Sequence, residues 1–218
     1  MSPHLVQRGR HIANGTIQCA LYALQYGIAL NVAGGTHHAF SDRGEGFCVF
    51  NDVAIAANYL LHQGLVHQIL VIDLDVHQGN GTAKIFMHDP RVFTFSMHGE
   101  KNYPLRKEES NLDLGMPDGA DDAYYLGILR ETLPRVLDEV QPDFIFYVAG
   151  VDVLATDKLG RLNLSISGCR DRDRMVLSAC KQHQVPVAVT MGGGYSDRLA
   201  LIIEAHANTF RLANELFF

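Results

Sequence analysis

The sequence predicts an α/β fold in which a mainly parallel sheet lies between two layers of helices. Apolar runs of strand length alternate along the chain with amphipathic stretches of helix length, the order expected when helices connect parallel strands. The runs are almost continuously apolar, which suits strands that are buried on both faces. Polar or glycine-rich residues follow each run, at the edge where such sheets form their sites.

The elements follow from this pattern in order along the chain. The expected strands are 28–33, 69–74, 91–97, 143–149 and 186–191, and the expected helices are 14–26, 51–63, 121–139, 168–183 and 196–216. Asn51, Asp121, Ser167 and Ser196 could each cap a helix start. Segment 98–120 lacks strong periodicity and is expected to be a loop, which at this length is usually functional or disordered. Residues 1–218 are expected to form a single domain.

Composition and charge narrow the function classes. A chain of 218 residues that is 47% hydrophobic and 19% charged is typical of a soluble globular protein. The net charge of -6 provides no basic footprint for direct nucleic-acid binding, and residues 170–174 are expected to form a solvated helix face. Four widely spaced cysteines favour a reduced, cytoplasmic protein without a zinc ribbon. No apolar run reaches the ~18 residues of a membrane span.

The ends of the predicted strands carry side chains that can bind metal or move protons. They are His37 and His38; Asp73, Asp75 and His77; Ser96 and His98; Asp152; and Gly192 to Gly194 with Tyr195. Each group alone is readily explained as a turn, a helix cap or a buried histidine with its hydrogen bonds made. Their joint placement at one edge of a sheet favours a common site.

These residue types together favour metal-assisted amide hydrolysis. Asp75, His77 and Asp152 would provide three ligands and leave an open position, as in catalytic zinc sites, although iron(II) or cobalt(II) would also fit. His37 or His38 could transfer the proton, and the Tyr195 hydroxyl could stabilise a developing alkoxide. The glycines at 192–194 would let the backbone approach closely enough to orient that tyrosine.

Five strings of residues resemble the histone deacetylase superfamily, which includes bacterial deacetylase-like proteins, acetoin-utilization proteins and acetylpolyamine amidohydrolases. The strings are GGTHHAF, GEGFCVFNDVAIA, ILVIDLDVHQGNGT, VAGVDVLATDKLG and MGGGYS, in that order. The loop HGEKNYPLRKEESNLDL is most similar to bacterial members close to the class IV deacetylases.

The resemblance implies an arginase/deacetylase-like fold and a role for each site residue. Zinc would be held by Asp75, His77 and Asp152; His38 would be the main general base and acid, His37 the second histidine, Asp73 its orienting partner, and Tyr195 the carbonyl-polarising group. Phe47, Tyr103 and Gly193 would contribute to substrate binding, with Tyr103 facing Phe47 and Gly46 leaving room for the substrate's methylene chain. A structural potassium site would use Asp73, Ser96, Met97 and backbone carbonyls of Asp75 and His77.

Three departures from the family pattern carry further expectations. Asn80 replaces an aspartate that many relatives pair with the second histidine, so we expect His38 to rest neutral. Gly79 and Leu154 stand where two-metal arginase relatives carry aspartates, so we expect a mononuclear site. The resemblance begins near residue 3, so we expect an N-terminally short domain whose exposed sheet edge would favour homo-oligomers.

The predicted function is therefore a cytoplasmic, zinc-dependent deacetylase acting on N-acetyl-lysine or a small N-acetylated amine through metal-activated water. The alternative is a non-catalytic or partner-dependent binding protein that retains the metal ligands.

Overall fold

The computed structural model describes residues 2–218. Within these residues six strands form one sheet in the order β1-β6-β5-β2-β3-β4, and every neighbouring pair is parallel. The strands are β1 (Ile28–Asn31), β2 (Ile69–Asp73), β3 (Val92–Gly99), β4 (Leu112–Met116), β5 (Phe144–Val148) and β6 (Val187–Thr190). The predicted α/β class is confirmed.

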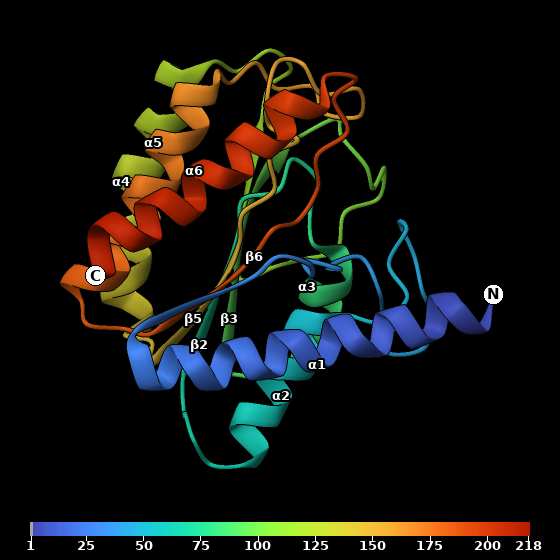
Figure 1. Ribbon diagram of the computed structural model, residues 1–218, viewed down its shortest axis with the longest axis vertical. Helices are drawn as coiled ribbons and strands as arrows, with labels where there is room; N and C mark the ends of the chain where they lie inside the picture. The colour runs from blue at the N-terminus through green and yellow to red at the C-terminus, as the bar shows by residue number, and fades with distance from the viewer. Residues whose placement is uncertain (1) are drawn as a thin grey trace.

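Helices cover both faces of this sheet, which gives three layers (Figure 1). They are α1 (Pro3–Tyr26), α2 (Asp52–His62), α3 (Asn80–Phe86), α4 (Asp122–Val140), α5 (Ile166–Gln182) and α6 (Leu199–Phe217). Alternate residues of β2 face opposite layers. Leu70 and Ile72 pack in the core beneath α4, α5 and α6, whereas Ile69 and Val71 pack beneath α1 and α2. Burial on both faces explains the continuous apolar runs.

The segment 98–120 is not a loop throughout, contrary to expectation. It includes the end of β3 and the whole of β4, which pairs with β3 from Phe95–Leu112 to Gly99–Met116. Because β4 lies at the edge of the sheet, three of its five residues are only half-buried and one is exposed. An edge strand of this kind lacks the continuous apolar run that identifies the central strands.

Helix boundaries differ from the predicted ones by at most three residues, except at the start of α1. Asn51 and Asp121 cap α2 and α4 as predicted. Ser165, not Ser167, caps α5, and no side chain caps α6. Helix α1 begins at Pro3, far before residue 14, because Ser2 caps it and proline fits its first turn. The short helix α3 was not predicted. Within residues 2–218, no helix has both the length and the apolar character needed to cross a membrane.

Candidate active site

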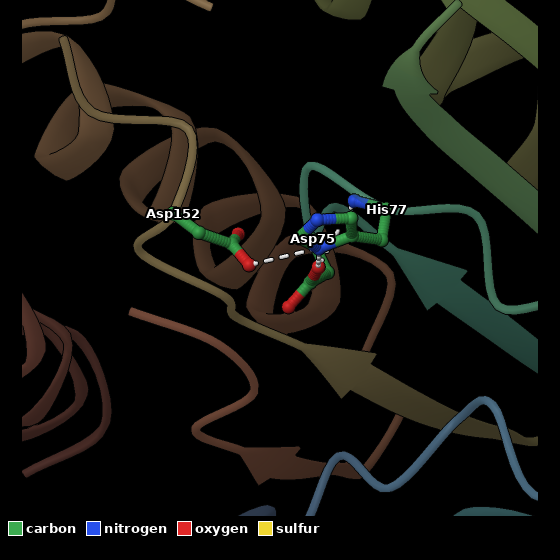
Figure 2. A group of neighbouring side chains, drawn as sticks. All are labelled: Asp75, His77 and Asp152. Atoms are coloured by element: carbon green, nitrogen blue, oxygen red, sulfur yellow. Dashed lines mark hydrogen bonds and ion pairs between the residues drawn. The ribbon is translucent and has the colours of Figure 1, made fainter. Parts of the chain in front are cut away.

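Three buried side chains gather at the carboxyl ends of the adjacent strands β2 and β5 (Figure 2). Asp75 and His77 follow β2, and Asp152 follows β5. One potential ligand atom from each lies within 4.8 Å of the others. His77 turns Nδ1 toward both carboxylates, at 3.0 Å from Asp75 Oδ1 and 3.2 Å from Asp152 Oδ2. This is the set of oxygen and nitrogen donors predicted as a metal site.

The bonding of this trio fits a cation. Asp152 Oδ2 is buried and, among residues 2–218, makes no hydrogen bond despite its approach to His77. Its other oxygen, Oδ1, accepts from the Val76 amide at 2.9 Å. A buried carboxylate oxygen without a partner is costly, and a metal ion is one of the groups that satisfies it. Carboxylate and imidazole donors suit zinc or iron(II).

The electrostatics of the trio favour an added positive charge. Burial and the neighbouring charge of Asp75 raise the pKa of Asp152 to about 7. Burial opposes protonation of His77, but the close Asp152 and Asp75 carboxylates outweigh it and raise its pKa to about 10. Two carboxylates buried together therefore stabilise a cation beside them, which is a proton on His77 when no metal is bound.

Glycines allow the backbone to approach these carboxylates. Gly193 donates its amide to Asp75 Oδ2 at 2.8 Å, and a Cβ added at Gly193 would overlap Asp152 Oδ2. A Cβ added at Gly150 would likewise overlap the Asp75 carboxylate. The close approach predicted for residues 192–194 is thus used to support the carboxylates.

We expect Gly193→Ala to weaken metal binding, because the added methyl group must displace Asp152 or the Gly193 backbone. A loss of about 10–100-fold in metal affinity is the usual scale for supporting residues. Gly127→Ala in α4 is the matched control, since a Cβ there meets nothing within 4 Å. Zinc titration with a competing chelator measures both. Equal affinity in the two variants would contradict the expectation.

A histidine pair lies beside the trio, with ring centroids 4.2 Å apart. His37 Nδ1 lies 2.6 Å from Asp73 Oδ2, and His38 Nδ1 lies 2.7 Å from Asn80 Oδ1. Burial lowers the pKa of His37, but the charges of Asp73 and Asp75 outweigh it and raise the pKa to about 9. Burial and the charge of His37 lower the pKa of His38 to about 3. At neutral pH His38 is therefore neutral and His37 carries the proton.

The histidines and the trio line a cavity of about 980 Å³ that also includes Gly46, Phe47, Tyr103, Gly193 and Tyr195. Two ring contacts surround the cavity. Phe47 lies 6.2 Å from the Tyr195 ring, whereas Tyr103 lies edge-on to His38 at 5.0 Å. Gly46 has φ +52, and a Cβ added there would overlap the His38 side chain.

Asp157 connects the two loops that carry Asp152 and Tyr195. Its Oδ1 accepts from the Leu159 and Gly160 amides at 2.8 and 2.9 Å, and its Oδ2 accepts from the Tyr195 amide at 2.6 Å. The carboxylate therefore fixes the backbone position of Tyr195 relative to the loop after β5.

The residues of the predicted potassium site also lie near the trio. Asp73 and Ser96 are register partners on β2 and β3, and Met97 follows in β3. Ser96 Oγ lies 2.9 Å from His98 Nδ1.

The expectation of a solvated face at residues 170–174 is wrong for Arg172 and Asp173, which are fully buried. Arg172 donates to the carbonyls of Leu74 and Gly150 at 3.0 and 2.6 Å, directly behind the loops that carry Asp75 and Asp152. The available signal was spacing: Arg172 and Asp173 lie on the stripe of α5 that includes Cys169, Val176 and Cys180.

Comparisons with known proteins agree with this fold and identify a family. The sequence model of the family described as "Histone deacetylase domain" matches residues 1–210. An uncharacterized protein of Picosynechococcus sp. is 48% identical over 216 residues, which are 99% of this chain and 72% of that protein. Histone deacetylase 2 of Arabidopsis thaliana is 32% identical over 89% of this chain, which spans 51% of its length.

Solved structures show the same fold. An acetylpolyamine aminohydrolase from Burkholderia pseudomallei is 26% identical, with a TM-score of 0.78 over 94% of this chain and 61% of that one. The HDA15 HD domain is 24% identical, with a TM-score of 0.79 over 94% of this chain and 62% of that one.

Proposed function

Because this chain belongs to the histone deacetylase family, we propose that it is a zinc-dependent deacetylase that hydrolyses N-acetyl-lysine or a small N-acetylated amine. The observation that carries the proposal is the joint lining of one cavity by the buried trio, the histidine pair and Tyr195. Fe²⁺ is the alternative ion for the same ligands. The similar proteins include a histone deacetylase and an acetylpolyamine aminohydrolase, which supports both classes of amine.

Each residue has a distinct part in the proposed reaction. Zinc held by Asp75, His77 and Asp152 would supply Lewis acidity and acidify a water molecule. His38, neutral at rest, accepts the proton of the attacking water and later returns it to the leaving amine. His37, charged and paired with Asp73, supplies positive potential beside it. Tyr195 donates its hydroxyl hydrogen to the acyl oxygen.

The remaining assignments follow the same family pattern. We propose that Phe47 and Tyr103 wall the substrate channel above His38 and Tyr195. Gly79 and Leu154 provide no side-chain ligand for a second metal, which favours a mononuclear site. Asp73, Ser96 and Met97 are proposed to contribute to a structural potassium site. Four free cysteines support a reduced, cytoplasmic setting.

Elemental analysis together with a substrate panel tests the proposed function. Purified protein loaded with zinc is expected to release acetate from an acetyl-lysine peptide or from acetylspermidine, and a chelator is expected to stop the reaction. A longer acyl-lysine peptide in the same panel measures the preferred chain length. A folded protein that binds no metal and hydrolyses none of these substrates would favour a binding function and contradict the proposal.

Asn80→Asp is expected to move the acidic limb of the pH–rate profile upward. Activity requires neutral His38, so it is lost as pH falls through the pKa of that histidine. A carboxylate at residue 80 would stabilise the imidazolium and raise this pKa, by about 1–3 units for a close opposite charge. Asn14→Asp, an exposed change in α1, is the control. A limb that stays in place in Asn80→Asp would contradict this role of the amide.

A further inference from the structure

Asn80 links His38 to an acidic residue, Glu45. While Asn80 Oδ1 faces His38 Nδ1 at 2.7 Å, Asn80 Nδ2 donates to Glu45 Oε1 at 2.8 Å. Tyr103 donates its hydroxyl to the same Oε1 at 2.7 Å, and Arg43 Nε lies 3.2 Å from Oε2. The backbone of Glu45 is held by paired hydrogen bonds with Cys48. Asn80 itself is only 2% exposed, so its contacts are largely shielded from water.

The chemistry of these groups determines which way the amide faces. An ionised carboxylate can only accept hydrogen bonds, whereas an amide has one donor end and one acceptor end. Hydrogen bonding by Tyr103 lowers the pKa of Glu45, so this carboxyl stays ionised at neutral pH. Glu45 therefore requires the NH₂ group of Asn80, and the Asn80 oxygen is left to face His38.

The orientation of the amide in turn determines the tautomer of His38. The Asn80 oxygen can only accept, so neutral His38 must carry its hydrogen on Nδ1 and keep the lone pair on Nε2. A reversed amide would present NH₂ to Nδ1. The hydrogen would then move to Nε2, and the nitrogen that faces away from Asn80 could no longer accept a proton.

We propose that Glu45 is a positioning residue that sets the tautomer of His38 through Asn80. This inference rests on the proposed function, in which His38 is the base. Glu45 also holds Tyr103, whose ring lies edge-on to His38, so one carboxylate fixes two groups around the base.

Replacing the acceptor with a donor tests the proposal. Glu45→Lys presents only donors to Asn80, which reverses the amide. We expect kcat to fall by at least about tenfold and at most by the roughly 10²–10⁴-fold that a general base contributes. Glu109→Lys is the matched control, because it makes the same charge change at an exposed position on the loop that carries Tyr103. An unchanged kcat in Glu45→Lys would overturn the proposal.

A rescue variant separates this role from a structural one. Aspartate at residue 80 accepts from His38 Nδ1 and from a lysine at residue 45 together. Glu45→Lys with Asn80→Asp is therefore expected to recover kcat toward that of Asn80→Asp alone. A double variant as slow as Glu45→Lys would contradict the tautomer relay.

Nitrogen-15 spectra of the imidazoles supply a readout that does not depend on turnover. His38, assigned by comparison with His38→Gln, is expected to be the Nδ1–H tautomer in the purified protein and in the double variant, and the Nε2–H tautomer in Glu45→Lys. The same Nδ1–H tautomer in all three would overturn the proposal. If no variant hydrolyses any substrate, the proposed function fails, and these spectra still decide the role of Glu45.

Discussion

Tyr195→Phe is expected to lower kcat for acetyl-lysine hydrolysis by about 10²–10³-fold, the usual effect of removing one oxyanion donor. Tyr195 lines the cavity that also contains Asp75, His77 and Asp152. Burial and the charges of Asp75 and Asp152 raise its pKa to about 12, so it remains protonated and able to donate at neutral pH. Asp157 fixes the Tyr195 backbone in both proteins, because it binds the amide and not the side chain.

The zinc content of Tyr195→Phe should remain that of the unaltered protein, since Tyr195 is not among the proposed ligands. Elemental analysis and steady-state kinetics on the same preparation measure both quantities. Tyr124→Phe, at an exposed position in α4, controls for loss of a tyrosine hydroxyl. A kcat within about threefold of the unaltered protein would exclude the proposed role. Loss of zinc would instead make Tyr195 a structural part of the metal site.

The trio could be predicted from sequence because all three residues follow the ends of apolar runs. Asp75 and His77 lie just after β2, where a bend with the His77 amide donating to Asp75 Oδ1 at 3.0 Å keeps them together. Asp152 joins them because β5 is parallel to β2 and lies next to it. The sequence contains no direct signal for that neighbour relation, but parallel strands place all their carboxyl ends at one edge of the sheet.

The contacts around the histidine pair could not be predicted in the same way. Glu45 and Tyr103 are 58 residues apart, and they meet at one carboxylate oxygen through side chains from separate loops. Neither loop has a periodicity that specifies its path. The hydroxyl hydrogen bond of Tyr103 to Glu45 holds its ring edge-on to His38, a contact that the sequence did not indicate. Contacts of this kind depend on loop conformation, which local sequence patterns describe poorly.

Burial of Arg172 and Asp173 was missed for a different reason. Alternating opposite charges are typical of a solvated helix face. In α5 the two buried charges instead pair with each other: Arg172 Nε and Nη2 donate to Asp173 Oδ1 at 2.9 and 2.8 Å. Tyr147 and Thr209 donate their hydroxyls to Asp173 at 2.5 and 2.7 Å. A buried charge is tolerated when it is paired and hydrogen-bonded, and charge pattern alone does not show those partners.

Arg172→Ala is expected to destabilise the protein by about 3–5 kcal/mol, because it leaves the Asp173 carboxylate buried without its counterion. It also removes the guanidinium that donates to the Leu74 and Gly150 carbonyls, in the loops that carry Asp75 and Asp152. The proposed zinc affinity should therefore fall together with stability. For a chain of this length, thermal unfolding of the zinc-free protein should shift downward by roughly 6–20 °C.

Two further variants make the measurement specific to the buried pair. Arg174 lies in the same helix as Arg172, and Arg174→Ala breaks only an exposed ion pair with Glu215 of α6, so it should change the unfolding temperature little. Arg172→Met combined with Asp173→Leu removes both charges, so it should be more stable than Arg172→Ala even though it loses more hydrogen bonds. If Arg172→Ala unfolds at the temperature of Arg174→Ala, the guanidinium does not support the core. If the double variant regains stability but not zinc affinity, the two carbonyl contacts of Arg172 specifically position the loops of Asp75 and Asp152.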